Sequence, residues 1–264
     1  MNLISEPFEA YQKRPELNCS KLKIAINSGM EFQMQSHPNY IPKPQSREMS
    51  LGTAVHCFVL EPGLFGSEYA VKPNGLSMST KEGRQWKEDN KDKIVMSQED
   101  HLFCLAMRNR MQMHPILANF ISSSAEKERT ILGQMKGVDA KARYDSFAHG
   151  AICDIKTSSA RTPDDFMHDL MVYHYDMQAA FYRLIFPGDL MPPFFFAVMS
   201  TSVWQLWCIN IDQHPEFVQS GFRKIERAFE NIYRIKEALD LKNTAHMTDV
   251  PEMQQRTRWE LEKY

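Results

Sequence analysis

Hydrophobic and polar positions follow two different patterns along the chain. The first part has the apolar spacing of helices, which are predicted at about 20–34, 50–60, 80–91 and 97–113, with Ser97 and Asp100 forming a capping-box-like start. The pattern changes near Glu126. Three consecutive strands are predicted in ERTILGQMKG, DAKARYDSFAHG and AICDIKTSS, separated by glycine-containing turns as in an antiparallel meander.

Helical and strand patterns alternate in the remainder of the chain. The stretch Thr162-Pro163-Asp164-Asp165 predicts a helix start, because it supplies an N-cap, a proline at the first helical position and acids in the first turn. This helix should run to about Phe186, followed by strands in FFFAVMS and VWQLWCINI. Further helices are predicted at about 215–239 and from about Pro251 onward. The order predicts one α/β domain with a helical part (1–125), a sheet-containing core (126–211) and C-terminal helices (212–264).

Composition places the chain among ordinary globular enzymes, with 43% hydrophobic and 24% charged residues. No run approaches the roughly 18 to 20 apolar residues of a membrane helix, and the first residues do not resemble a secretory signal, so we expect a cytoplasmic protein without membrane partners. The net charge of −2 leaves room for a local basic groove that binds nucleic acid.

Two kinds of cofactor site are absent from the sequence. The five cysteines are scattered and form no CxxC pair, which argues against an iron–sulfur cluster and against a disulfide framework. No GxxxxGK[ST] motif is present, which argues against an ATP motor within the chain.

Charged residues interrupt two of the predicted strands. Asp154 and Lys156 are two residues apart and share a strand face, and Lys141, Arg143 and Asp145 alternate on the preceding strand. If these strands pair, two carboxylates converge beside a lysine. Such carboxylates repel one another unless a cation lies between them, and Mg²⁺ or Mn²⁺ suits oxygen ligands of this kind. The alternative interpretation is an ion pair at the end of a strand.

The set Asp145…Asp154-x-Lys156, followed by a helix, resembles the PD-(D/E)XK nuclease signature. LGTAVHCFVLEP, GVDAKARYD and YHYDMQAAFY are similar in order and spacing to segments of RecE (exonuclease VIII) and related phage recombination exonucleases. The resemblance covers Leu51 to Tyr182. It implies a restriction-endonuclease-like α/β core in which helices flank a central mixed sheet.

The resemblance also implies roles for individual residues. Taken alone, His56 on its apolar helix would be a core residue, and AEKER would be a run of solvated charges. The resemblance instead places a metal-binding glutamate before the strands, at Glu128 or alternatively at Glu126. The implied metal ligands are Asp145, Asp154, His56, Glu128 and the backbone carbonyl of Ile155. The implied catalytic residues are Lys156, Gln178, Tyr182 and His56. Relatives often carry a histidine three residues before the glutamine, where this chain has Tyr175, with His174 displaced by one.

Candidate DNA contacts surround this predicted site. They are Lys136, Lys141, Arg143, Thr157 and Ser158. Basic side chains would meet phosphates, and the hydroxyls would donate hydrogen bonds to them; sheet-edge charges and a loop before a helix are the alternatives. The aromatic residues near positions 194–207 are predicted to be mainly core, with Trp204 or Trp207 as an option for stacking on an unpaired base.

The expected function is a Mg²⁺-dependent exonuclease, with Mn²⁺ as a substitute, that degrades linear double-stranded DNA from its ends. The resemblance implies 5′→3′ polarity, independence of ATP and 3′ single-stranded overhangs as products. It further implies a homo-oligomeric ring and a single-strand annealing protein as partner, in a phage- or prophage-type recombination system. The alternatives are a structure-specific endonuclease of the same superfamily and a catalytically silent protein that binds DNA ends.

Overall fold

The computed structural model describes residues 2–37, 39–41, 44, 46–186, 188 and 191–244. The strands in these ranges are β1 (Asn2–Ser5), β2 (Tyr69–Val71), β3 (Ile94–Met96), β4 (Glu126–Met135), β5 (Val138–Ala148), β6 (Ala151–Ser158), β7 (Phe194–Ser200) and β8 (Leu206–Asn210). The helices are α1 (Phe8–Lys13), α2 (Cys19–Ala25), α3 (Gly29–Gln35), α4 (Arg47–Leu60), α5 (Pro62–Glu68), α6 (Lys81–Asp89), α7 (Gln98–Met113), α8 (Leu117–Ile121), α9 (Pro163–Val172), α10 (Tyr175–Ile185) and α11 (Pro215–Thr244), with a 3-10 turn η1 at Ile211–Gln213.

A six-stranded mixed sheet forms the centre of the molecule, in the order β1-β4-β5-β6-β7-β8. The strands from β4 to β6 are the predicted antiparallel meander. Strand β7 pairs parallel to β6, because α9 and α10 carry the chain across the sheet between them, whereas β8 returns antiparallel to β7. The predicted α/β architecture with a central mixed sheet and flanking helices is confirmed.

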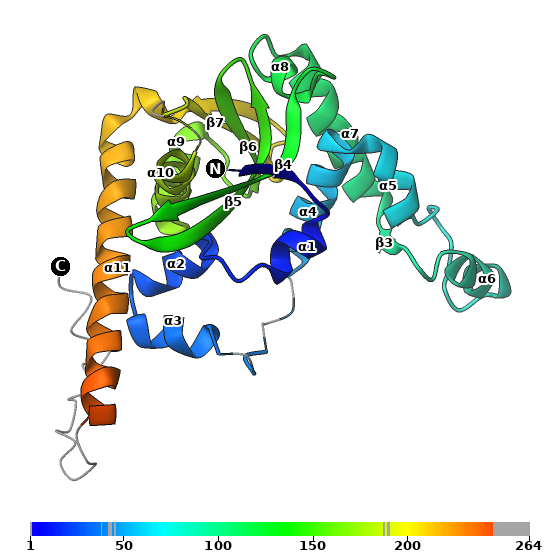
Figure 1. The fold of residues 1–264 in the computed structure, drawn as a ribbon. Coiled ribbons are helices and arrows are strands. Elements are labelled where there is room, and N and C mark those ends of the chain that lie inside the picture. Colours follow the sequence, from blue (N-terminus) through cyan, green and yellow to red (C-terminus); the bar gives the residue numbers. More distant parts are fainter. Residues whose placement is uncertain are drawn as a thin grey trace.

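Helices cover both faces of this sheet, and two apolar clusters fill the spaces between the layers (Figure 1). One cluster joins the sheet to α2, α10 and α11, and it includes Tyr144, Ile152 and Phe196. The other joins the sheet to α4, α7 and α8, and it includes Cys153 and Ile155. Neighbouring residues of β6 thus belong to opposite clusters, as the alternation of side chains along a strand requires.

Strands β5 and β6 pair only close to the turn that joins them. Their ladder consists of Ala148↔Ala151, Phe147↔Ile152 and Ser146↔Cys153, although both strands continue well beyond it beside their other neighbours. Beyond Ser146 and Cys153 the two strands separate, and we call this separation the fork. There the segment around Leu17 lies beside β5 in place of β6, since Leu17 forms a bridge with Ala140. The fork is the feature of the fold that creates room for a site.

Side-chain caps set most of the predicted helix starts. The hydroxyls of Thr80, Ser97 and Thr162 accept hydrogen bonds from backbone N–H groups three residues on, and Thr162 with Asp165 forms a complete capping box. Helix α4 begins earlier than predicted, because Ser46 rather than Ser50 is its N-cap.

Two predicted helices are each divided in two. The helix expected at 20–34 is broken between α2 and α3, where Ser28 caps the second piece. Gly29 there packs so tightly on α11 that an added Cβ would lie 2.3 Å from the Asn231 carbonyl oxygen. The helix expected at 162–186 is broken at His174, which adopts a left-handed conformation with a φ of 55°. Lys23 and Lys224 stabilise this break by donating to the Tyr173 and Met171 carbonyls at 2.9 and 3.2 Å.

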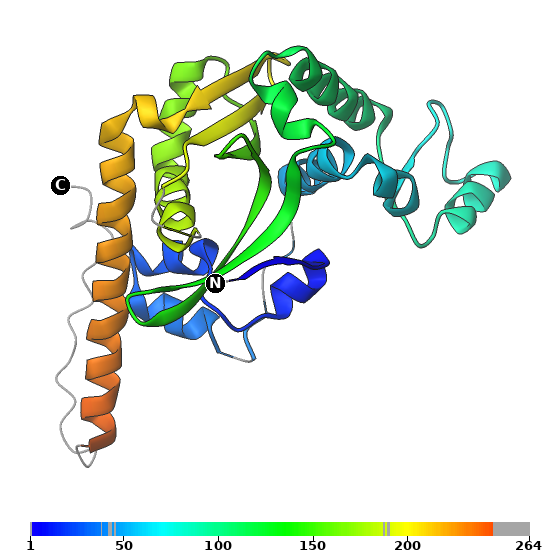
Figure 2. The same ribbon diagram turned by 45° about the horizontal axis from the view of Figure 1, so that its top comes forward.

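Several observed elements were not predicted, namely β1, α1, α5, β2, β3 and α8. The segment with β2, α6 and β3 extends away from the central sheet on the side of α5 (Figures 1 and 2). The helix predicted from Pro251 onward lies outside the described residues. Among the described helices, none is long and apolar enough to cross a membrane.

Candidate active site

The candidate site lies at the fork between β5 and β6. The first residues beyond the last paired position are Asp145 on β5 and Asp154 on β6. With no backbone partner across the gap, the Ile155 N–H donates to the Asp145 carboxylate at 2.6 Å, and the Tyr182 hydroxyl donates to the Arg143 carbonyl at 2.8 Å. Side chains thus replace the missing ladder, and the Ile155 N–H orients the carboxylate of Asp145.

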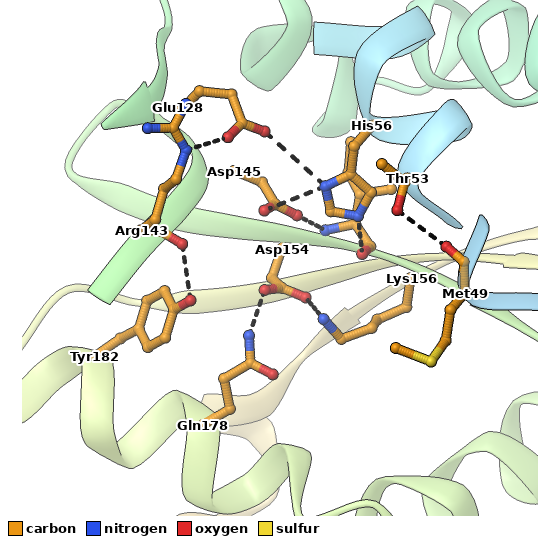
Figure 3. A network of polar contacts seen from close by, with 11 residues as sticks. Met49, Thr53, His56, Glu128, Arg143, Asp145, Asp154, Lys156, Gln178 and Tyr182 are labelled. Atoms are coloured by element: carbon orange, nitrogen blue, oxygen red, sulfur yellow. Dashed lines mark hydrogen bonds and ion pairs between the residues drawn. The ribbon is translucent and has the colours of Figure 1, made fainter. Parts of the chain in front are cut away.

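Three side chains that can bind metal meet on the α4 side of the fork (Figure 3). One ligand atom each of His56, Glu128 and Asp145 lies within 4.8 Å of the others. The His56 Nδ1 is 3.4 Å from Asp145 Oδ1 and 4.0 Å from Glu128 Oε1. Glu128, rather than Glu126, is the glutamate that joins this group.

The backbone of Glu128 is unusual for its residue type. Its φ of 51° lies in the left-handed region, and the β4–β5 register skips the position where Glu128 would oppose Asp145. Such a conformation costs on the order of 1–3 kcal/mol and persists where the surroundings enforce it, commonly at functional sites. Here it directs a carboxylate toward His56.

The electrostatics of this group favour a bound cation. Burial and repulsion by Asp145 raise the pKa of Glu128 to about 7. Burial alone would lower the pKa of His56, but the carboxylates of Asp145 and Glu128 outweigh it and raise that pKa to about 9. Burial disfavours ionisation of Asp145, yet His56 and Lys156 hold its pKa below the ordinary value. Two carboxylates and an imidazole are suitable ligands for a divalent ion, so these residues fit a metal.

We expect the metal-free protein to lose stability as the pH rises from about 6.5 to 9. Folding raises the pKa of His56 from 6.5 to about 9. The stabilisation of the fold by protonated His56 is therefore complete below pH 6.5 and is lost as the pH rises to about 9. The full shift corresponds to about 3 kcal/mol. Thermal melts in EDTA should show this decline, and saturating Mg²⁺ should reduce it because the ion replaces the proton. A melting temperature independent of pH in EDTA would contradict this electrostatic account.

The Ile155 carbonyl, predicted as a metal ligand, contacts the imidazole in this structure. Its oxygen lies 3.0 Å from His56 Nε2. A backbone carbonyl at the outer nitrogen fixes the orientation of a histidine ring and leaves the other nitrogen, Nδ1, to face the carboxylates. Ile155 thus orients a candidate ligand.

Asp154 and Lys156 form a second set of residues, directed toward α10. Asp154 is 2% exposed, forms an ion pair with Lys156 and accepts a hydrogen bond from Gln178 Nε2 at 2.6 Å. Asp154 therefore lies beside the three-residue group but does not belong to it. Burial would lower the pKa of Lys156, but Asp154 and Asp145 outweigh this and raise it, so the ammonium stays charged.

Two lysines contact the ring of Tyr175, which extends what the sequence indicated. The Lys156 Nζ lies 5.0 Å from the centre of the Tyr175 ring, and the Lys23 Nζ lies at the same distance from that ring. A cation over an aromatic face is attracted to it, so Tyr175 helps to hold the lysine. Lys23 comes from α2, and no pattern in the sequence pointed to its position here. His174 is the αL residue before α10; its carbonyl accepts from the Gln178 N–H at 3.2 Å, but no hydrogen bond of its imidazole to these groups is found in the described residues.

Gln178 offers a direct test of this second set. Replacing it by alanine removes the hydrogen bond to Asp154, and the loss of such supporting contacts typically costs about 10–100-fold in activity. We expect Gln178→Ala to lower kcat and to leave KM for DNA nearly unchanged. Gln134→Ala is the matched control, because exposed Gln134 also donates to an aspartate, Asp139, but on the distant β4–β5 turn. A rise in KM alone would instead make Gln178 a DNA contact.

Arg143 was predicted as a DNA contact, but the structure shows it inside the site. Its side chain is 9% exposed and donates to Glu128 Oε2 at 2.6 Å and to the Glu6 carbonyl at 2.7 Å. Arg143 shares a strand face with Asp145, as the alternation along β5 predicted, and Glu128 accepts from its guanidinium. Contact with DNA stays a prediction for Arg143. Arg143 holds one carboxylate oxygen of Glu128 and leaves the other near His56.

We expect Arg143→Met to weaken Mn²⁺ binding by roughly 10–100-fold, the usual effect of losing a residue that orients a metal ligand. Isothermal titration with Mn²⁺ measures this loss without any substrate. Lys136→Met is a control, since Lys136 is a partly exposed cation paired with Glu226 at the other end of the β4–β5 hairpin. Unchanged affinity in Arg143→Met would show that Glu128 needs no such support.

The two remaining basic candidates lie away from the site, unlike Arg143. Lys141 is 1% exposed, and its ammonium donates to the Tyr11 and Arg14 carbonyls at 2.7 and 2.6 Å. The predicted DNA contact was wrong for Lys141, because its buried ammonium binds these two carbonyls and so attaches the N-terminal segment to the sheet. Lys136 is nine residues from Asp145 along the hairpin, about 30 Å at the rise of a strand, and it was wrongly placed near the site.

The hydroxyl candidates lie beside the site, in a cleft that begins at Lys156. Thr157 and Ser158 both line this cleft, and Ser158 Oγ donates to Asp169 at 2.8 Å. Trp204 also lines the cleft, whereas Trp207 packs against an apolar cluster of the core. Of the two tryptophans that the sequence could not distinguish, only Trp204 therefore lies in the cleft.

One solved structure shares this architecture. A crystal structure from Eubacterium rectale, described as a "Putative exonuclease", superposes with a TM-score of 0.62 at 18% identity, covering 95% of this chain and 96% of that one. A second crystal structure, of SSO0001, has a TM-score of 0.35 at 14% identity and covers 83% and 81% of the two chains. No curated protein matches the sequence. Residues 18–248 match the family described as PDDEXK-like domain of unknown function (DUF3799), and the chain belongs to that family.

Proposed function

We propose that this protein is a Mg²⁺-dependent deoxyribonuclease that hydrolyses phosphodiester bonds at the ends of linear double-stranded DNA. One observation carries the proposal. The fork between β5 and β6 brings three side chains that could bind a metal, those of His56, Glu128 and Asp145, next to the charged, buried pair of Asp154 and Lys156. Membership of the PDDEXK-like family and the fold shared with the Eubacterium rectale protein support a nuclease.

The two sets of residues suit different parts of phosphodiester hydrolysis. His56, Glu128 and Asp145 would hold a divalent ion, which lowers the pKa of bound water and neutralises charge on the phosphate. Lys156 remains protonated, which favours stabilisation of the negative charge that develops on the phosphate over a role as general base. Gln178 and Asp154 hold the ammonium in place, and Tyr182 fixes the backbone of β5 at Arg143.

The finer features of the proposal rest on the resemblance to RecE-like exonucleases. They are 5′→3′ polarity, independence of ATP, 3′ overhangs as products, a homo-oligomeric ring around DNA and cooperation with a single-strand annealing protein in a phage-type system. We propose further that the chain acts as a single nuclease domain. Mn²⁺ should substitute for Mg²⁺, since both ions accept carboxylate, carbonyl and water ligands.

A cleavage assay with two substrates tests the proposal. Linear duplex labelled at either the 5′ or the 3′ end is incubated with Mg²⁺ and without ATP, beside closed circular plasmid. We expect the linear duplex to be degraded, the 5′ label to be released first and the circle to stay intact. Chelation with EDTA should stop the reaction.

The other outcomes distinguish the alternatives. Nicking of the circle would indicate a structure-specific endonuclease of the same superfamily. Binding of DNA ends without cleavage in Mg²⁺ or Mn²⁺ would indicate a catalytically silent end-binding protein, with Asp154 and Lys156 serving only as an ion pair.

A further inference from the structure

The segment from β2 to β3 (69–96), which we call the arm, holds α6 away from the rest of the molecule. In both views α6 lies at the far end of this segment and does not lie against the central sheet (Figures 1 and 2). The root of the arm is nonetheless firmly attached. Strands β2 and β3 pair in parallel, Tyr69 and Met96 are buried in the apolar cluster that joins the sheet to α4, α7 and α8, and Lys93 Nζ donates to the Gly66 carbonyl at 2.7 Å.

The tip of the arm is built from its own contacts. Thr80 caps α6, and Arg84 donates to the Ser79 carbonyl at 2.9 Å. Gly83 packs so closely on the preceding loop that an added Cβ would lie 1.9 Å from the Ser77 carbonyl oxygen. A helix that packs on its own loop, and not on the body of the protein, presents the rest of its surface to solvent. The side chains on that surface therefore indicate what the arm could bind.

Basic residues line one side of α6. Lys81, Arg84 and Lys87 follow one another at intervals of three residues, so they cover an arc of about 120° on the helix surface. All three side chains are exposed. Within the described residues, none of the three forms an ion pair with an acid, whereas Lys91, just after the helix, does. The basic arc is thus free to meet negative charge from outside the chain.

The acidic residues of the arm do not cancel this charge. Glu82 and Asp89 lie outside the basic arc, at 100° per residue around the helix. Glu88 lies within the arc but is paired with Lys91 at 2.7 Å. From 69 to 96 the arm has six basic and four acidic residues, in a chain whose net charge is −2. Its basic side is therefore complementary to a polyanion.

A DNA duplex suits this surface better than an unpaired strand. Trp86 is the one aromatic residue at positions 72–93, and it is half-buried and lies outside the basic arc. The arc thus offers no ring on which an unpaired base could stack. A duplex presents one phosphate charge per about 1.7 Å of its axis, and Lys81 and Lys87 are about 9 Å apart along the helix. Several phosphates would therefore lie within reach of the arc at once.

From these observations we propose that the arm binds the phosphate backbone of duplex DNA through Lys81, Arg84 and Lys87, away from the catalytic groups. The arm joins α5, which directly follows the helix of His56, to α7, so the fold sets its position relative to the candidate site. Contacts with phosphates hold DNA without regard to its sequence. The inference rests on the proposed nuclease function, which makes DNA the ligand.

Binding of a linear duplex in Ca²⁺ at several salt concentrations is the first part of the test. We expect Lys81→Gln/Lys87→Gln to weaken binding on the order of tenfold at low salt, because two phosphate contacts are lost. The slope of log affinity against log salt should fall in magnitude by about 2, one for each lost contact. Lys81→Arg/Lys87→Arg should bind like the wild type, since arginine keeps the charge. Wild-type affinity and slope in Lys81→Gln/Lys87→Gln would overturn the inference.

Arg223→Gln/Arg227→Gln is the matched control. These two exposed residues lie on α11, on the opposite side of the molecule from α6 (Figures 1 and 2), and their replacement removes the same amount of charge. We expect this control to keep the affinity and the salt slope of the wild type. Equal losses in both double variants would overturn the inference, because only the overall charge of the protein would then matter.

Sedimentation of the DNA-free protein examines a different occupant of the arm, a second copy of the chain. We expect the wild type and Lys81→Gln/Lys87→Gln to sediment alike. A changed oligomeric state of this variant, together with wild-type affinity for the duplex, would overturn the inference and make the arm a contact between copies.

Cleavage kinetics separate this inference from the proposed function. Lys81→Gln/Lys87→Gln should raise KM for linear duplex on the order of tenfold and leave kcat nearly unchanged, because α6 stands apart from β5 and β6 (Figures 1 and 2). Equal KM in this variant and the wild type would show a nuclease whose arm does not hold its substrate. Failure of the wild type to cleave in Mg²⁺ or Mn²⁺ would overturn the proposed function, whereas binding in Ca²⁺ would still decide whether the arm holds DNA.

Discussion

Asp145→Asn should abolish both metal binding and DNA cleavage. Asp145 supplies the carboxylate closest to His56, at 3.4 Å, and it is the acid in the three-residue group whose pKa stays low. A bound metal contributes several kcal/mol of charge stabilisation in phosphate chemistry. We therefore expect kcat/KM to fall by on the order of 10³-fold or more.

The fold should survive this substitution. Asparagine keeps an oxygen that can accept from the Ile155 N–H, and loss of the negative charge relieves the repulsion that raises the pKa of Glu128. Mn²⁺ titration, cleavage of linear duplex and a thermal melt measure the three properties separately. Asp139→Asn is a matched control at the exposed start of β5, beside the β4–β5 turn. Wild-type Mn²⁺ affinity in Asp145→Asn would place the metal elsewhere.

Lys156→Met should abolish cleavage but spare Mn²⁺ binding. The lysine pairs with Asp154, which lies outside the group of His56, Glu128 and Asp145. Its charge would serve the transition state, where removal of one stabilising group commonly costs about 10²–10³-fold in kcat. Loss of Mn²⁺ binding together with activity would mean that the two sets act as one site.

The same variant should also destabilise the protein. It leaves the carboxylate of Asp154, 2% exposed, without its cation, and breaking a buried ion pair typically costs about 3–5 kcal/mol. The double variant Lys156→Met/Asp154→Asn removes both charges, so we expect it to recover most of the melting temperature and none of the activity. A double variant no more stable than Lys156→Met would show that the pair contributes little to the fold.

Local chemistry was readable from the amino-acid sequence alone. Thr80, Ser97 and Thr162 start their helices because a hydroxyl can accept a backbone N–H within the same turn, whatever lies around it. The meander of β4, β5 and β6 follows from alternating side chains and glycine turns. The spacing of Asp145, Asp154 and Lys156 and the resemblance to a PD-(D/E)XK family predicted the mixed α/β fold on the same local grounds.

Breaks and bends inside elements were not readable in this way. The divided helix at His174 contains neither proline nor glycine at the break. Its left-handed residue is stabilised by Lys23 and Lys224, which reach it from α2 and α11. A local pattern carries no information about such distant donors.

Only the folded chain determines which charged groups meet. Lys141, Arg143 and Asp145 share one strand face, yet their partners differ. Lys141 binds the N-terminal segment, Arg143 donates to Glu128 and Asp145 faces His56. The difference arises because the fork removes β6 from the side of β5, so each residue finds a partner from another part of the chain. Residue types and spacing define the possible chemistry at 145–156, and packing across the fork assigns each residue its partner.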